Sequence, residues 1–242
     1  MSTPVLVTEL LPRTLAEADV STPAGRAWLE TVYAPAAGNR VRLNMITSLT
    51  GSAVGSDGTS ETLTSQVDRA ILGIIRAAAD VVVVGASTVR AEGYLAPRSA
   101  ALAIVTATGR LDGHRLDAED GRTGRILLVC PAARASAVAS ERDAQGIDAE
   151  IVAVPGGDDL DPRAILDALR DHGLDRAVCE GGPTLASRFV EAGMIDELCV
   201  TVTPVVGPAP SPFIRVTDGA QASVAGMLVD EAGFSYLRLR RS

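Results

Sequence analysis

The sequence predicts a single α/β domain in which helices flank a mostly parallel central sheet. The first observation behind this is a set of short apolar runs rich in β-branched residues, of which Val81–Val84 is the clearest. Such runs are typical of strands that are buried on both faces. The second observation is that segments with helical spacing alternate with these runs, which requires crossover connections and therefore parallel strands. No linker-like stretch divides the chain.

The strands are expected in order along the chain. They comprise residues 40–49, 81–84, 102–105, 126–129, 151–154, 177–179, 195–203 and 234–239. Residues 40–49 alternate between apolar and polar at their start, and residues 234–239 alternate throughout, which is the period of a strand. Pro204 ends the strand 195–203, and a loop follows at residues 208–212.

The helices are recognised by their first residues and their apolar faces. They are expected to begin at Thr22, Ser60, Gly85, Pro131, Asp161 and Pro183. The helix from Ser60 is long, and its apolar face is formed by Leu63, Val67, Ala70, Ile71, Ile74 and Ile75. Ser87 or Thr88 is the expected N-cap of the short helix after Gly85. Prolines suit a first helical position because their missing N–H has no partner there, and Gly173 and Gly193 end the last two helices.

Charge and cysteine usage exclude several classes of partner. The 242 residues carry a formal net charge of −8 and no basic block, so we expect neither nucleic acid nor an anionic membrane as a partner. Asp80 interrupts the apolar run 77–86, so this run is not expected to span a membrane. No secretory signal is visible, and three cysteines are scattered, which favours the cytoplasm and argues against a zinc site.

Two glycine-containing turns lead from a strand into a helix. They are Gly85–Thr88 and Glu180–Leu185. Glycine lets a ligand approach the backbone, and the free N–H groups of a helix start favour a phosphate. A tight turn without any ligand is the alternative for each. In parallel sheets ligands bind beyond the carboxyl ends of strands, where the segments 47–58, 106–110 and 203–204 are also expected.

Several motifs then resemble one enzyme family. Residues 43–49 read LNMITSL, residues 83–94 read VVGASTVRAEGY, residues 103–111 read AIVTATGRL and residues 180–185 read EGGPTL, followed by MIDEL at 194–198. In this order they resemble the reductase domain of riboflavin biosynthesis, in its stand-alone actinobacterial form. The resemblance covers roughly residues 40–240 and implies a dihydrofolate reductase-like fold with one antiparallel edge.

The resemblance also implies an activity and its partners. It implies an NADPH-dependent reductase that converts the ribose of 5-amino-6-(5-phosphoribosylamino)uracil to a ribityl chain, as a homodimer. Residues 40–242 would form the reductase domain, with residues 1–39 as a lead-in packed on it. The H-x-E and P-C-x-x-C zinc signature of deaminases does not occur in the sequence, so deamination is expected from another protein.

Site residues follow from the matching motifs. The expected cofactor-binding residues are Gly85, Ser87, Thr88, Thr106, Arg110, Gly181, Gly182, Thr184 and Leu185. The expected substrate-binding residues are Asn44, Ser48, Thr203 and Pro204. Among the first set, Thr106 and Arg110 are placed to meet the adenosine 2′-phosphate, because an arginine fork suits a phosphate. A solvated loop charge is the alternative for Arg110.

The proton donor is left open by the sequence. Family members commonly carry Ser-Leu-Asp-Gly after the first strand, whereas this chain has Thr50 in place of the aspartate. Asp57 could replace it if the loop folds back, and Glu180 is a second candidate acid, with a structural carboxylate as its alternative. A dihydrofolate or pterin reductase of the same fold, and an NADP(H)-binding protein without turnover, are the competing functions.

Overall fold

A computed structural model describes residues 4–94, 96–114, 116, 124–219 and 221–241. Its strands are β1 (Leu6–Leu11), β2 (Glu17–Asp19), β3 (Val41–Ser48), β4 (Val81–Gly85), β5 (Ala101–Val105), β6 (Ile126–Pro131), β7 (Glu150–Val154), β8 (Ala177–Gly181), β9 (Glu197–Thr203), β10 (Ala222–Asp230) and β11 (Ser235–Arg241). Its helices are α1 (Pro23–Val32), α2 (Gln66–Ala77), α3 (Ala86–Glu92), α4 (Ala135–Ala144), α5 (Pro162–Asp171) and α6 (Pro183–Glu191). Short 3₁₀ turns η1 (Glu61–Leu63) and η2 (Ala132–Arg134) precede α2 and α4.

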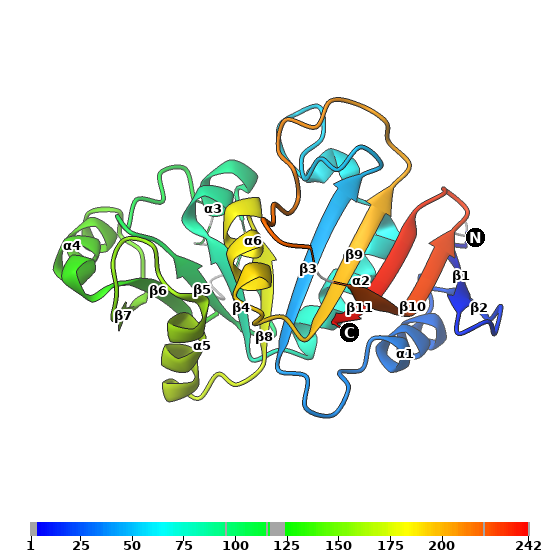
Figure 1. The fold of residues 1–242 in the computed structure, drawn as a ribbon, viewed down its shortest axis with the longest axis horizontal. Coiled ribbons are helices and arrows are strands. Elements are labelled where there is room, and N and C mark those ends of the chain that lie inside the picture. Colours follow the sequence, from blue (N-terminus) through cyan, green and yellow to red (C-terminus); the bar gives the residue numbers. More distant parts are fainter. Residues whose placement is uncertain (1–3, 95, 115, 117–123, 220, 242) are drawn as a thin grey trace.

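All described strands belong to one twisted sheet (Figure 1). Their order is β2-β1-β10-β11-β9-β3-β8-β4-β5-β6-β7. Every pair from β9 to β7 is parallel, whereas every pair from β2 to β9 is antiparallel. The expected fold class is therefore confirmed, with the antiparallel strands gathered at one edge.

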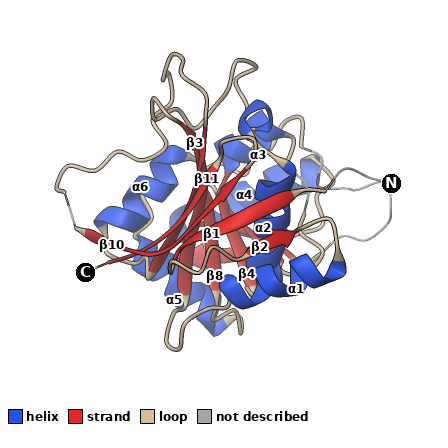
Figure 2. Cartoon of the chain, turned by 90° about the vertical axis from the view of Figure 1, so that its right-hand side faces the viewer, coloured by secondary structure: helices blue, strands red, loops and turns tan. Residues whose placement is uncertain are grey.

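Helices cover the two faces of the sheet unequally. Buried side chains of α1, α2, α3 and α4 pack on one face, and those of α5 and α6 pack on the other. Successive residues of β4 alternate between these layers: Val82 and Val84 join the first core, and Val81 and Val83 join the second. This alternation explains why the run is continuously apolar, because a strand covered on both faces has no polar side. Figure 2 shows α1 and α2 on the same side of the sheet.

The antiparallel edge is larger than the sequence predicted. Strands β1 and β2 were not expected, yet β1 pairs with β10 and β2 pairs with β1. Within residues 4–39, β1 and β2 therefore extend the sheet, and α1 packs on it. Strand β10 was also missed, since a bulge between Val224 and Gly226 interrupts its alternation. The expected helix from Thr22 is confirmed, with the Thr22 hydroxyl accepting the Gly25 N–H.

The starts of three helices differ from the prediction. Pro131 ends β6, and α4 begins at Ala135 after a 3₁₀ turn. Helix α2 begins at Gln66 and not at Ser60, because Thr64 is extended and the Ser65 side chain accepts the Asp68 N–H as an N-cap. Helix α3 has Gly85 as its N-cap, and no side chain caps it. The predicted starts of α5 and α6 are confirmed at Pro162 and Pro183. None of the helices in the described ranges is long and apolar enough to cross a membrane.

Candidate functional site

The two glycine turns predicted from the sequence lie side by side at the carboxyl ends of β4 and β8. The Gly182 N–H donates to the Thr88 hydroxyl at 2.8 Å, which joins the start of α6 to α3. The peptide bond between Gly181 and Gly182 is cis. A Cβ atom at Gly182 would lie 2.5 Å from Oγ1 of Thr88, so any larger residue there displaces the threonine. At Gly181, where φ is +86°, a Cβ atom would lie 2.8 Å from the Met45 sulfur.

A groove of about 300 Å³ opens on one side of these turns, and we call it the α3–α6 groove. Its lining includes the predicted residues Gly85, Ser87, Thr106, Gly182, Thr184 and Leu185. Neither α3 nor α6 has a side-chain cap on its N-terminal N–H groups. The same holds for α4, which does not line the groove, whereas side chains cap α1, α2 and α5. Uncapped helix starts that face a hollow are suited to an anion such as a pyrophosphate.

The loop after β5 lines the same groove but differs in detail from the prediction. The Thr106 hydroxyl accepts the N–H groups of Thr108 and Gly109, so it shapes the turn. The Arg110 side chain is two-thirds exposed, pairs with Asp112 at 3.2 Å and does not line the groove. The cations that line it are Arg90 and Arg188, which the sequence analysis did not single out.

A second hollow, of about 410 Å³, lies on the other side of the turns, and we call it the α2–β3 cavity. It is lined by Asn44 of β3, by several charged residues of α2, and by Thr88, Tyr94 and Glu180. Ser87, Gly182 and Pro183 line both this cavity and the α3–α6 groove. The two hollows thus share one wall, made of the starts of α3 and α6.

Glu180 lies in the α2–β3 cavity as one member of an ion-paired cluster. Its carboxylate accepts hydrogen bonds from Nε and Nη2 of Arg76 at 2.7 and 2.6 Å, and from the Tyr94 hydroxyl. Burial and the Glu180 charge raise the pKa of Tyr94 well above its usual value. Burial lowers the pKa of Arg76, but the bonds to Glu180 outweigh this effect and raise it. The carboxylate therefore binds side chains, and not the backbone N–H groups expected as the alternative.

Asp68 is the acidic residue that the sequence analysis missed. It lies in the first turn of α2, half-buried in the wall of the α2–β3 cavity, and accepts a hydrogen bond from the Thr64 hydroxyl at 2.6 Å. Burial raises its pKa above the usual 3.8, even though hydrogen bonds from Thr201 and Thr64 oppose the shift. A carboxyl group with a raised pKa in a cavity is a candidate general acid. The sequence signal was an aspartate three residues after a serine N-cap, hidden by the expected helix start at Ser60.

Asp57 does not replace the missing aspartate at position 50. Its exposed carboxylate binds the N–H and hydroxyl of Thr59 and the hydroxyl of Thr62. These bonds, those of Thr59 first, lower its pKa, which is unfavourable for a proton donor. The Thr50 hydroxyl donates to the Gly207 carbonyl at 2.7 Å, so it joins two loops. Neither residue lines the α2–β3 cavity.

Three of the four predicted substrate residues also lie outside this cavity. Ser48 is buried, and its hydroxyl accepts the Ser52 N–H at 3.0 Å and contacts that of Thr50. Thr203 is buried at the end of β9, and Pro204 is exposed beside it. Only Asn44 faces the cavity. The structure therefore brings together the predicted cofactor residues more completely than the predicted substrate residues.

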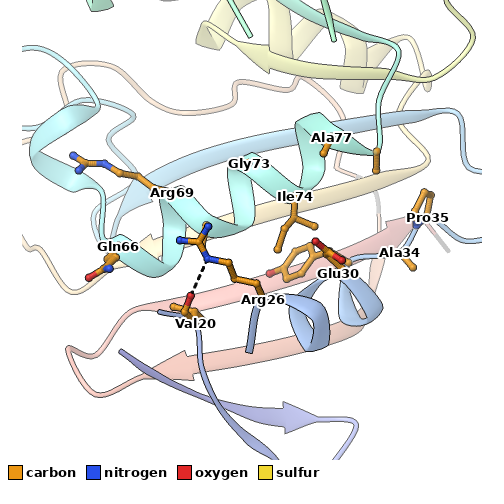
Figure 3. A pocket seen from close by; sticks show the side chains of 13 residues that line it. Val20, Arg26, Glu30, Ala34, Pro35, Gln66, Arg69, Gly73, Ile74 and Ala77 are labelled. Carbon is orange, nitrogen blue, oxygen red and sulfur yellow. Dashed lines mark hydrogen bonds between the residues drawn. The ribbon is translucent and has the colours of Figure 1, made fainter. Parts of the chain in front are cut away.

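A larger hollow of about 660 Å³ lies between α1 and α2 and contains none of the predicted site residues (Figure 3). Arg26 and Glu30 of α1 face Gly73 and Ile74 of α2 across it. Arg26 donates through Nε to the Val20 carbonyl at 3.3 Å. This hollow lies apart from the strand ends and glycine turns, so its size does not make it the functional site.

Comparisons with known proteins identify the family of the chain. A profile of the RibD C-terminal domain matches residues 39–218, well over half of the chain. A search of curated proteins found no match. The matched residues include the parallel part of the sheet and the helices α2 to α6 that flank it.

Solved structures share the fold at low sequence identity. A pyrimidine reductase-like protein from Corynebacterium diphtheriae is 21% identical over 88% of this chain and 98% of its own, with a TM-score of 0.71. A diaminohydroxyphosphoribosylaminopyrimidine deaminase/5-amino-6-(5-phosphoribosylamino)uracil reductase from Thermotoga maritima is 20% identical over 84% of this chain and 57% of its own, with a TM-score of 0.65. The riboflavin biosynthesis reductase of Saccharomyces cerevisiae is 15% identical over 84% of this chain and 90% of its own, with a TM-score of 0.66. The chain therefore belongs to the RibD C-terminal domain family.

Proposed function

We propose that this protein is an NADPH-dependent reductase of riboflavin biosynthesis that reduces the ribose of 5-amino-6-(5-phosphoribosylamino)uracil to a ribityl chain. The observation that carries the proposal is the wall of Ser87, Gly182 and Pro183, which the α3–α6 groove and the α2–β3 cavity share. A dinucleotide in the groove would meet a substrate in the cavity at this wall. Family membership supports the same activity.

The residues of the α3–α6 groove fit a dinucleotide. The uncapped N–H groups at the starts of α3 and α6 would hold the pyrophosphate, and glycines at 85 and 182 allow its close approach. Bound NADPH supplies the hydride, while the protein supplies orientation and a proton. Asp68 is the proton donor in this proposal, because its raised pKa keeps a larger fraction protonated near neutral pH than an ordinary aspartate has.

Arg69 is the residue that we assign to the substrate phosphate. It lies between the α2–β3 cavity and the hollow of Figure 3 and lines both, is 59% exposed and pairs with the exposed Glu61. Such an exposed pair is worth little, so a phosphate can take the place of Glu61. The other cavity cation, Arg76, is bound by Glu180 and is only 22% exposed.

Arg69→Ala is expected to raise the KM for the phosphorylated ribosylaminouracil about tenfold, as loss of a charge-assisted contact does. Steady-state rates of NADPH oxidation at varied substrate concentration measure this KM. Arg163→Ala, in α5, is the control, because it changes the same charge away from both hollows. An unchanged KM would remove Arg69 from the phosphate site.

A pterin such as dihydrofolate is the second candidate substrate, and one observation favours it. The lining of the α2–β3 cavity includes the carboxylates of Glu61, Asp68, Glu92 and Glu180 and the guanidinium groups of Arg69 and Arg76. When all six groups are ionised, four negative and two positive charges give the cavity lining a summed charge of −2. This charge disfavours a phosphate and favours a heterocycle that accepts a proton. For this substrate the Arg69 variant is expected to leave KM unchanged, so the same assay separates the two candidates.

We propose that the chain forms a homodimer through the exposed side of the antiparallel edge. Tyr236 packs in the core beside α2, so its neighbour Leu237 points to the opposite face. Leu237 pairs with Val200 and Met227, and Leu239 pairs with Leu198 and Val224, which makes an apolar sheet face. Val224 is 46% exposed. A partner that covers this face would remove apolar surface from water.

Leu237→Arg is expected to convert the dimer to a monomer, since it places an unpaired charge in the centre of this face. Sedimentation equilibrium measures the mass of both forms. Val206→Arg is the matched control, because Val206 is 77% exposed in the loop after β9. A Leu237→Arg protein that remains dimeric would show that the subunits meet elsewhere.

A further inference from the structure

We infer that Arg90 selects NADPH over NADH by binding the 2′-phosphate that only NADPH carries. This inference rests on the proposed function, because it assigns one contact of the same dinucleotide. It replaces the expectation that Arg110 has this role. Arg90 lines the α3–α6 groove and connects α3 to the loop after β5.

The charged residues of the described groove lining are Arg90, Asp158 and Arg188. Two of them pair with an oppositely charged residue outside the lining. Arg134 holds Asp158 with two hydrogen bonds of 3.0 Å. Arg188 pairs with Asp159 at 2.9 Å and also donates to the Leu160 carbonyl.

Arg90 differs because no carboxylate of the described residues lies within 4.0 Å of it. Its Nη1 donates to the Arg110 carbonyl at 2.7 Å. That bond orients the side chain without neutralising its charge. Arg90 is therefore the cation of the described groove lining that pairs with no carboxylate of the described residues, so it can bind an anion.

The position of Arg90 matches the adenosine end of a dinucleotide. A pyrophosphate held between the starts of α3 and α6 leaves the groove toward Thr106 and Thr108, which follow β5. Arg90 lies one turn after Ala86 in α3, and its bond to the Arg110 carbonyl connects α3 to this loop. Because Nη1 holds the loop, the Nε and Nη2 groups remain for a phosphate, which an arginine binds in a bidentate manner.

Arg110 supplies the matched control. It belongs to the same loop, carries the same charge and contributes its backbone carbonyl to the Arg90 contact, which Arg110→Ala preserves. Its guanidinium pairs with Asp112 in solvent. The two substitutions therefore change the charge of the protein equally and differ in whether the groove loses a cation.

Calorimetric titration with NADPH, NADH and adenosine 2′,5′-bisphosphate tests the inference without any need for turnover. Arg90→Ala is expected to lower the affinity for NADPH and for the bisphosphate about 10- to 100-fold, because charge-assisted bonds to one phosphate are lost. The affinity for NADH is expected to fall less than about twofold. Arg110→Ala is expected to bind all three ligands as the parent does. Arg90→Gln retains the aliphatic stem, and it is expected to show the same selective loss if the alanine variant does not fold.

The outcomes separate this inference from the proposed function. A parent protein that binds neither dinucleotide would contradict the proposed function itself. A parent that binds NADPH, with an Arg90 variant that loses both dinucleotides equally or loses neither, would overturn the role of Arg90 alone. A selective loss of NADPH affinity in Arg110→Ala would show that Arg110, and not Arg90, binds the 2′-phosphate.

Discussion

Gly182→Val is expected to weaken NADPH binding at least about 100-fold and to abolish turnover, since small displacements in a binding site have effects of that size. The Cβ atom would lie 2.5 Å from the Thr88 hydroxyl, and its two methyl groups would enter the wall shared by both hollows. The Gly182 N–H would also lose its bond to that hydroxyl. Calorimetric titration with NADPH measures the loss.

Gly219→Val is the control for this variant. No atom lies within 4 Å of the position that a Cβ at Gly219 would take, and Gly219 belongs to the loop before β10. Circular dichroism of both variants reports whether the fold survives. A folded Gly182→Val protein that binds NADPH as the parent does would place the dinucleotide outside the α3–α6 groove.

Asp68→Asn is expected to lower kcat by about 10²- to 10⁴-fold, the usual contribution of a general acid, with NADPH affinity unchanged. In the parent, kcat is expected to fall as pH rises through the raised pKa of Asp68, because the carboxyl group loses its proton. The variant should lose this pH dependence. Asp57→Asn is the control, and its activity should equal that of the parent because Asp57 lies outside the cavity. A full kcat in Asp68→Asn would contradict the assignment.

The same substitution should stabilise the protein at neutral pH. The folded pKa of Asp68 lies above the usual 3.8, so the charged carboxylate is less favourable in the fold than in the unfolded chain. The stability of the parent is therefore greatest below about pH 3.8 with respect to this group, and it falls as pH rises through the folded pKa. Thermal unfolding at pH 7 and at pH 3.5 is expected to show an advantage for Asp68→Asn only at the higher pH.

The parallel half of the fold could be predicted from the sequence because its signals are local. Val81–Val84 is apolar on both faces, and Asp161 with Pro162 marks a helix start without reference to the rest of the chain. The antiparallel edge could not be predicted in the same way. Strand β10 has an irregular alternation, and β1 finds its partner more than 200 residues away, as the pairing of Val7 with Asp230 shows.

The glycines of the sequence indicate where the candidate site lies, but the sequence does not identify all of its side chains. Gly182 marks the shared wall, because a Cβ atom there would lie 2.5 Å from Oγ1 of Thr88. Asp68 lies in the first turn of α2 because Ser65 is the N-cap of that helix. The helical spacing of apolar residues continues upstream of Ser65, so the sequence did not indicate this start. Arg90 and Arg110 both follow glycine turns, so the sequence does not distinguish them. In the structure, Arg90 lines the groove and binds the Arg110 carbonyl, whereas the Arg110 side chain pairs with Asp112 at the surface.

The most direct measurement is NADPH oxidation by the purified protein, followed separately with the phosphorylated ribosylaminouracil and with dihydrofolate. The account predicts tight NADPH binding and turnover of the ribosylaminouracil that Gly182→Val and Asp68→Asn both remove. Turnover of dihydrofolate alone would keep the site and change the substrate to the second candidate. NADPH binding without turnover of either substrate, or no NADPH binding at all, would contradict the proposed reductase.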